Sequence, residues 1–482
     1  MPANNLIVIM SDEHDPRYIG AAGDSFIQTP HLDALAARGT RFTQAVTTSP
    51  ICVPARASFA TGQLVHDIGY WDNAIAYDGA VPSWGHALQD AGITVESIGK
   101  LHYQNDEAPA GFDVEHIPMN LYNGHGMVWG SVRDPLPSMA PHGKRMLGDF
   151  IGPGESTYTR YDASVTARAR AWLSAHAQSE SPWCLFIGLV APHFPLVVSQ
   201  DYLDLYPLTT LPPRKLHPET GYQRHPWVQR AHDFLPSEDQ FRNRDERDLA
   251  IACYLGLVSW MDANVGQIMT ALDALSLTDS TRVIYTSDHG DNVGHRGLWG
   301  KSNFYAESVA VPMLMAGPDV PIGVVDTPVS LIDLYPTVLE AMGVPPPDDD
   351  LPRPGSSLFA LASGPVQSDR PVFSEYHAVA TESAGFMMRA GRWKYHHYVG
   401  YPPELFDLND DPDELHDLGE DPGYAGVRRD MHGLLLDVCD PVTVDARAKA
   451  AQADLIERHG GRGNALSVGA PAATPPPGEK QT

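Results

Sequence analysis

Near its N-terminus the sequence reads LIVIMSDE over residues 6–13. The apolar, largely β-branched first part predicts a buried strand over Leu6–Met10, and Ser11-Asp12-Glu13 follow where it ends. Three later segments show the same arrangement, an apolar run followed at once by polar side chains. They are Ile93–Ile98 before Gly99-Lys100-Leu101-His102, Trp183–Val190 before Ala191-Pro192-His193, and Arg282–Thr286 before Ser287-Asp288-His289-Gly290-Asp291. Helical patterns separate these runs, which predicts an α/β fold with a mostly parallel central sheet flanked by helices.

The polar residues at the strand ends are expected to form one site, because ligands of open α/β sheets bind beyond the carboxyl ends of the strands. Singly, each residue has a structural alternative: an Asp after a strand often caps a turn, and a lone His is more often packed than ligating. Carboxylates with one imidazole suit Ca²⁺, Mg²⁺ or Mn²⁺, and the nitrogen ligand favours Mn²⁺. The expected members of the site are Asp12, Lys100, His102, His193, Asp288 and His289.

Two segments are predicted to be helices. Thr29–Arg38 has Thr29 as a candidate N-cap, proline in the first helical position and Gly39 as a stop signal. Leu249–Leu275 is long and apolar, with a helical pattern and no internal proline.

The pattern changes after about Gly364, where short strands are predicted instead. They are Pro371–Glu375, Gly385–Ala390 and Trp393–Val399, with a hairpin turn at Ala390-Gly391. We therefore predict a large α/β domain over residues 1–364, a small C-terminal α+β domain with an antiparallel sheet over 365–440, and a tail over 441–482. The end of the tail, Gly460–Thr482, is rich in Gly, Ala and Pro, which predicts disorder or packing on a neighbouring chain.

The charge of the chain limits its partners. Its 482 residues include 33 Lys and Arg against 60 Asp and Glu, for a formal net charge of -27. This charge argues against nucleic acid or a membrane as the main partner, and it requires a locally positive site for any anionic substrate. The four cysteines form no CxxC pair, and we found no leader segment, so we expect a cytoplasmic protein without structural disulfides.

The most specific segment is SPICVPARASFATG, residues 49–62. Pro54 suits the first turn of a helix, which places Cys52 at the helix N-terminus, where backbone N–H groups favour negative charge. Arg56 lies one turn further on the same face and can hold an anionic oxygen. The alternative is an ordinary buried cysteine, with Arg56 in a salt bridge.

Cys52-Val53-Pro54-Ala55-Arg56 resembles the C-x-P-x-R signature of type I, formylglycine-dependent sulfatases in the alkaline phosphatase superfamily. The resemblance runs from about Asn5 to about Asp417, and within the family it is strongest to choline-sulfatase-like and phosphonate-monoester-hydrolase-like members. Segments typical of that branch are Gly99-Lys100-Leu101-His102, Gly297-Leu298-Trp299-Gly300-Lys301 and Asp454-Leu455-Ile456-Glu457-Arg458-His459-Gly460-Gly461. The resemblance implies an alkaline-phosphatase-like fold.

The resemblance also implies a role for each matching residue. A formylglycine-generating enzyme would oxidise Cys52, and one divalent cation (Mn²⁺ or Ca²⁺) would be held by the modified residue with Asp12, Asp288 and His289. Arg56 would stabilise the hydrated aldehyde, Lys100 and Lys301 would hold non-bridging oxygens, and His102 and His193 would move protons. Asn73 and Trp129 occupy regions that contact the organic part of the substrate, although Trp129 also suits simple packing. Glu13 departs from the family, in which a second Asp is common.

Several functions agree with these residues. The first is hydrolysis of sulfate monoesters, aryl or small alkyl, with a small anionic ester as substrate. The alternatives are a phosphonate monoester or phosphodiester hydrolase with the same site, a choline sulfatase, and a catalytically silent anion-binding relative. The tail after Asp440 resembles segments that reach a neighbouring subunit, which predicts a homo-oligomer, a dimer or tetramer.

Overall fold

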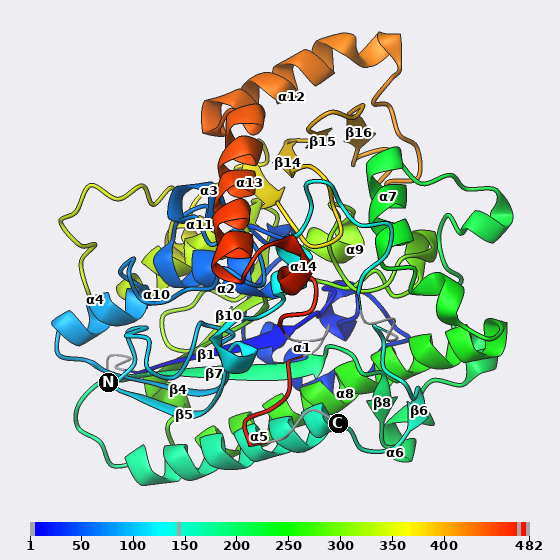
Figure 1. Ribbon diagram of the computed structural model, residues 1–482. Helices are drawn as coiled ribbons and strands as arrows, with labels where there is room; N and C mark the ends of the chain where they lie inside the picture. The colour runs from blue at the N-terminus through cyan, green and yellow to red at the C-terminus, as the bar shows by residue number, and fades with distance from the viewer. Residues whose placement is uncertain (1–4, 142–145, 470–473, 479–482) are drawn as a thin grey trace.

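The computed structural model describes residues 5–141, 146–469 and 474–478. Its centre is an eight-stranded sheet of order β11-β2-β10-β9-β1-β7-β4-β5. Figure 1 labels β1, β4, β5, β7 and β10 of this sheet. Five of the seven strand pairs are parallel, and β10 runs antiparallel to both of its neighbours, which confirms the mostly parallel sheet. The strands are β1 Asn5–Asp12, β2 Gly39–Phe42, β4 Thr94–Lys100, β5 Val114–Met119, β7 Trp183–Pro192, β9 Thr281–Ser287, β10 Met313–Ala316 and β11 Gly323–Val325.

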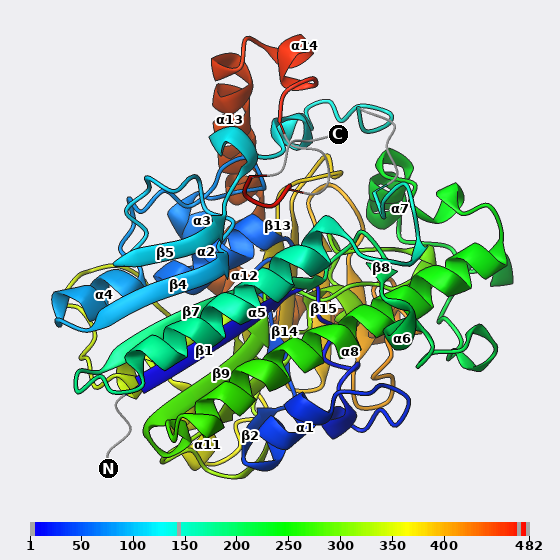
Figure 2. The same ribbon diagram turned by 90° about the horizontal axis from the view of Figure 1, so that it is seen from below.

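Helices cover both faces of this sheet (Figure 2). One face carries α1 Pro30–Ala37, α5 Thr157–His176 and α8 Arg244–Ala274, and the other carries α2 Cys52–Thr61, α4 Trp84–Asp90, α10 Leu334–Ala341 and α11 Leu358–Ser363. In β1, Leu6, Val8 and Met10 belong to one buried cluster, and Ile7 and Ile9 belong to the other. The strand is apolar throughout because both of its faces are covered.

The two predicted helices form, with corrected ends. The first stops at Ala37, and Gly39 opens β2, where a Cβ would lie 2.1 Å from the Met315 carbonyl oxygen. Thr29 stands at the N-cap position without capping, because its hydroxyl hydrogen-bonds Asp33 instead. The second helix, α8, begins five residues before the predicted start, at Arg244, where the Asn243 side chain accepts from the Glu246 N–H.

Helix α8 is also long and apolar enough to cross a bilayer by composition. However, 83% of its most apolar window is buried within the fold, as in the core helix of a globular protein.

A smaller antiparallel sheet follows, of order β13-β14-β15-β16. Its hairpin turn is Gly391-Arg392, between the paired Ala390 and Trp393, one residue later than predicted, and Gly391 takes a φ of 57° there. The Glu404–Asp407 strand was not predicted as a strand. The elements are β13 Val372–Tyr376, β14 Gly385–Ala390, β15 Trp393–Tyr398, β16 Glu404–Asp407, α12 Ala425–Val438 and α13 Pro441–Arg458.

The tail packs on its own chain where it is described. On α13, Asp445 pairs with the buried Arg133 at 3.1 Å, and Gln452 accepts a hydrogen bond from the same side chain at 2.6 Å. Parts of the segment predicted to be disordered, residues 470–473 and 479–482, lie outside the described residues. The remaining short elements are β3 Ala45–Val46, α3 Val65–Ile68, β6 Gly152–Pro153, β8 Val197–Val198, α6 Gln200–Leu203, α7 Pro226–Phe234, α9 Ala306–Val309, β12 Val329–Ser330 and α14 Arg462–Ala465.

Candidate active site

The order of the strands brings the predicted polar residues together. Strands β9, β1, β7 and β4 are consecutive neighbours and run parallel, so their carboxyl ends meet at one edge. Asp288 follows β9, Asp12 ends β1, His193 follows β7 and Lys100 ends β4. Each is less than 5% exposed.

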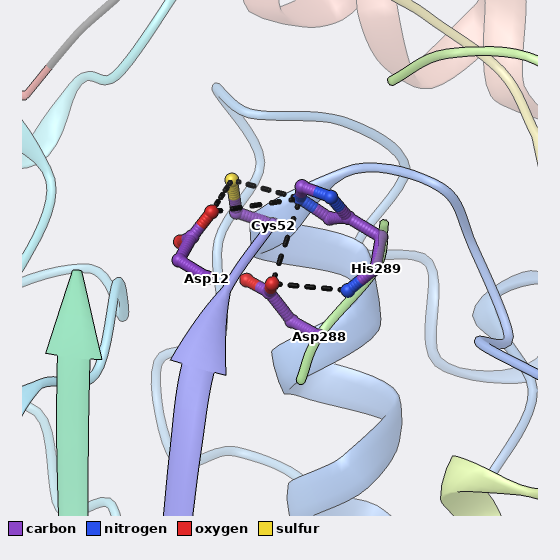
Figure 3. A group of neighbouring side chains, drawn as sticks. All are labelled: Asp12, Cys52, Asp288 and His289. Atoms are coloured by element: carbon purple, nitrogen blue, oxygen red, sulfur yellow. Dashed lines mark hydrogen bonds and ion pairs between the residues drawn. The ribbon is translucent and has the colours of Figure 1, made fainter. Parts of the chain in front are cut away.

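Helix α2 supplies the cysteine. All ten of its residues are buried, and Cys52 is the first. The Cys52 Sγ lies 3.3 Å from the Nε2 of His289 and 3.7 Å from an oxygen of Asp12 (Figure 3). Burial, reinforced by the Asp12 carboxylate, raises the pKa of the Cys52 thiol to about 12, so the unmodified thiol is protonated at neutral pH.

The donor set fits a divalent cation. Asp12, Cys52, Asp288 and His289 each offer one donor atom, and these atoms all lie within 4.8 Å of one another. The Nδ1–H of His289 donates to the Gly290 carbonyl at 3.0 Å, so Nε2 carries the free lone pair and faces the other donors. A backbone partner of this kind commonly fixes the tautomer of a metal-bound histidine. Two carboxylates and one imidazole suit Mn²⁺ or Ca²⁺.

Arg56 holds the two carboxylates in place. Its Nε donates to Asp288 at 2.8 Å, one terminal nitrogen lies 3.3 Å from Asp12, and the other donates to the Lys100 carbonyl at 3.0 Å. Arg56 was expected to hold an anionic oxygen. The anionic oxygens that it contacts belong to Asp12 and Asp288, two of the candidate metal ligands. Burial alone would raise the pKa of Asp12, but Lys100, then His193, Lys301 and Arg56, hold it well below its ordinary value.

Glu13 stands apart from the four donors. Its carboxylate forms an ion pair with Lys301, and it groups with Asp12 and His193 instead. Burial raises the pKa of Glu13 to about 7, against the opposing pull of Lys301. The ammonium of Lys301 also lies 5.2 Å from the centre of the Phe194 ring.

Two histidines stand beside this cluster. The Nδ1–H of His193 donates to the Phe194 carbonyl at 2.6 Å, which leaves its Nε2 as an acceptor. The Nε2 of His102 lies 2.9 Å from the hydroxyl of Thr474. Burial holds the pKa of both imidazoles well below the ordinary value, with help from Lys100 at His102 and from Lys301 at His193.

Sequence reasoning missed two contributors. Thr474 comes from the tail, where no motif marks it. Asp291 belongs to a quoted motif but received no role; it accepts from the backbone N–H of Val293 and of Gly300 and so anchors the loop that carries Lys301. Gly290, in the same motif, permits a close approach of the backbone, because a Cβ there would lie 2.2 Å from the Glu307 carbonyl oxygen.

The two residues suggested for the organic part of the substrate lie in different places. Asn73 lines the cavity above Cys52, and its side-chain oxygen accepts from the Val53 N–H at 3.1 Å. Trp129 is buried and stacks on Phe234, with ring centres 6.2 Å apart, and it is not among the residues that line the cavity. The position of Trp129 therefore agrees with the alternative that this side chain packs in the core and does not contact the substrate.

Comparison with solved structures confirms the expected alkaline-phosphatase-like fold. A phosphonate monoester hydrolase of Agrobacterium radiobacter matches with a TM-score of 0.74 at 23% identity, covering 92% of this chain and 96% of that one. At this identity the likeness concerns the fold alone.

The chain belongs to the sulfatase family, whose family model, Sulfatase, matches residues 4–344. A second model, N-sulphoglucosamine sulphohydrolase, C-terminal, matches residues 294–440. A choline-sulfatase of Rhizobium meliloti (strain 1021) is 33% identical over 434 residues, covering 85% of this chain and 81% of the relative. Human arylsulfatase K is 28% identical over 444 residues, covering 86% of this chain and 78% of the relative.

Proposed function

We propose that this protein hydrolyses sulfate monoesters, aryl or small alkyl, with a formylglycine formed from Cys52 and one divalent cation. The observation that carries the proposal is the group of four donor atoms within 4.8 Å at the N-terminus of α2. The sulfatase relatives, at 28% and 33% identity, favour sulfur over phosphorus.

In this proposal Asp12, Asp288, His289 and the modified residue 52 hold the cation. The cation supplies Lewis acidity, and the hydrated formylglycine supplies a hydroxyl nucleophile. Arg56 keeps the two carboxylates in position.

Lys100 and Lys301 both line the cavity and would neutralise the non-bridging oxygens of the ester. We assign the proton transfers to His193, whose Nε2 is an acceptor, and to His102, whose Nε2 lies 2.9 Å from the Thr474 hydroxyl, with one of the two acting at the leaving oxygen.

The test is a side-by-side measurement of kcat/KM for an aryl sulfate, an aryl phosphonate monoester and a phosphodiester. Mass spectrometry must first confirm formylglycine at residue 52, and Mn²⁺ or Ca²⁺ is supplied. We expect the sulfate to be hydrolysed orders of magnitude faster. A lead for the phosphorus esters would reassign the reaction to phosphorus, and no hydrolysis by the fully modified protein would indicate a silent relative.

A further inference from the structure

Strand β7 loses its neighbours just before it reaches the site. Its pairings with β1 and β4 both run as far as Gly188, and β1 pairs with it again only at Pro192. Residues 189–191 therefore have no register partner in either strand, all of whose residues the structure describes. His193 follows directly. Because buried backbone N–H groups need partners, another element must hold this stretch of chain.

A buried carboxylate on helix α5 takes over from the missing strand partners. Asp162 is 0% exposed, and its two oxygens accept from the N–H of Val190 at 2.8 and 3.0 Å. One of them also accepts from the N–H of Ala191 at 2.8 Å. An ionised carboxylate suits this role, because it only accepts and its hydrogen bonds are stronger than those of a neutral acceptor.

This contact extends to His193 through one residue. The carbonyl of Val190 accepts from the N–H of His193 at 3.0 Å, so Asp162 and His193 bind the two sides of Val190. The ring of His193 is in turn oriented by its Nδ1–H, which donates to the Phe194 carbonyl. The place of the free Nε2 therefore depends on the strand end that Asp162 fixes.

The same face of α5 also contacts the histidine ring. Tyr158 stands one turn before Asp162 on the helix and lines the cavity. Its ring lies edge-on to that of His193, with ring centres 5.7 Å apart, and its hydroxyl donates to the Thr474 carbonyl. Helix α5 thus holds His193 from its ring and from its backbone.

The link between Asp162 and His193 is one of position. Burial lowers the pKa of His193, and the charges that act on this pKa most are those of Lys301, Asp12 and Lys100. The influence of Asp162 runs instead through the two backbone N–H groups that it binds.

We propose that Asp162 is a positioning residue for the reaction, and that its carboxylate holds the end of β7 so that His193 meets the ester in a fixed place. This inference rests on the proposed function, in which His193 moves a proton. A misplacement of about 1 Å in a reacting group costs about a hundredfold in rate, so the effect is measurable.

Asp162→Asn tests the role, because it keeps the shape of the side chain but can turn an NH₂ group toward a backbone N–H. Hydrolysis of para-nitrophenyl sulfate is followed at pH 8, above the pKa of about 7 to which burial raises Asp162, with formylglycine confirmed at residue 52. We expect kcat to fall at least about tenfold and KM to change less than about twofold, because Lys100 and Lys301 come from other segments.

Thr166→Val is the matched control. Thr166 stands one turn beyond Asp162 on α5 and is 2% exposed, and its hydroxyl donates to Asn264 at 2.9 Å. The variant loses a buried hydrogen bond of the same helix but none at the end of β7, so it should keep the wild-type kcat.

A double-mutant cycle separates positioning from a general loss of stability. In a His193→Gln background, Asp162→Asn should lower kcat by less than about a further twofold, because the group that it positions is already gone. Equal losses in both backgrounds would overturn the proposal, as would a wild-type kcat in His193→Gln or in folded Asp162→Asn. If Asp162→Asn does not fold, Asp162→Glu replaces it with the same expectations, since it keeps the charge but moves it outward by a methylene group.

Hydrogen exchange, followed by mass spectrometry, tests the contact without turnover. Amides of residues 189–194 should exchange faster in Asp162→Asn than in the wild type or in Thr166→Val. If the wild type releases sulfate and this exchange is unchanged in Asp162→Asn, only the proposal for Asp162 is overturned. If the fully modified wild type releases no sulfate, the proposed function fails, and the role of Asp162 in the reaction fails with it.

Discussion

Arg56 shows how one side chain can serve structure and chemistry together. It is 1% exposed and reaches both candidate metal carboxylates and the backbone of Lys100 through its three nitrogens. A lysine has one ammonium and cannot make this planar, forked set of contacts. The candidate cation site and the fold around it therefore depend on the same guanidinium.

We predict that Arg56→Lys lowers kcat/KM for an aryl sulfate at least about a hundredfold and the free energy of unfolding by about 3 kcal/mol, because it leaves buried carboxylate contacts unmade. Steady-state kinetics and denaturant titration measure the two effects. Arg429→Lys is the control, since Arg429 is 78% exposed. Wild-type values for both quantities would contradict the role given to Arg56.

Cys52→Ala is expected to lose nearly all turnover while the protein still folds, because the nucleophile and one cation donor disappear together. Circular dichroism checks folding, and sulfate release checks turnover. Cys439→Ala, at a partly buried free cysteine in the C-terminal region, should keep full activity. Near-wild-type activity in Cys52→Ala would refute the mechanism.

Residues that follow a strand could be predicted from the sequence, and residues from distant segments could not. Asp12, Lys100, His193 and Asp288 come together at one edge as predicted, because each stands within three residues of the end of an apolar run and neighbouring parallel strands end together. Thr474 reaches His102 from 372 residues away, and no local pattern encodes such a contact.

At the level of elements, β15 and β16 are joined by a buried carboxylate. Glu404 on β16 accepts from the Tyr305 and Tyr398 hydroxyls at 2.7 Å each and from the Nδ1–H of His396 at 3.0 Å. Burial alone would raise the pKa of Glu404, but His396 first, together with the nearby Tyr305 and His225, lowers it to about 2.

This carboxylate predicts a loss of stability in acid. The pKa of Glu404 is about 2 in the folded state against 4.5 as its ordinary value, so the unfolded chain binds more protons between these pH values. The Glu404 carboxylate contributes roughly 3 kcal/mol to the free energy of unfolding. This contribution is complete above the ordinary pKa and is lost as the pH falls toward 2. We expect the free energy of unfolding of wild type minus that of Glu404→Gln to shrink as the pH falls from 6 to 3.

Denaturant titrations across this pH range measure the difference. Glu180→Gln, at an exposed glutamate, is the control and should give a difference that does not change with pH. A pH-independent difference for Glu404→Gln would contradict the prediction.

The strands that the sequence did not reveal are short or half-exposed. β1, β7 and β9 are long and apolar because helices cover both of their faces. β10 has four residues, and β5, at the edge of the sheet, has exposed Val114 and Ile117. Such segments lack the length or periodicity on which strand prediction depends.

For the whole molecule, the tail contributes to the cavity of its own chain. The Thr474 hydroxyl contacts His102, and the Tyr158 hydroxyl donates to the Thr474 carbonyl at 2.6 Å. Before it, α13 is fixed by Asp445 and Gln452, so the tail divides into an anchored helix and an end that reaches the site.

We predict that deleting residues 470–482 leaves the chain folded and raises KM for an aryl sulfate roughly threefold to tenfold, because one wall beside His102 is lost. Thr474→Val, which keeps the tail but removes the hydroxyl, should give a smaller effect. Unchanged kinetics would contradict the contact.

The same deletion tests the proposed homo-oligomer. We propose that the chain assembles as a dimer or tetramer with the tail as a contact between copies, and light scattering with and without residues 470–482 measures the mass. A mass that is the same in both proteins would refute that role for residues 470–482.

The two ends of the cavity come from different parts of the chain. Neighbouring strand ends, the start of α2 and the loop that carries Lys301 build the reactive end, and Thr474 of the tail lies beside His102 there. Helix α7 and other connecting loops build the rest of the wall, which we call the organic end. Substitutions at the organic end leave the sheet untouched, so new leaving groups can be acquired in evolution without rebuilding the centre that cleaves them. Laboratory libraries confined to α7 and its neighbouring loops should therefore retain a folded catalyst in most members while its range of substrates diversifies.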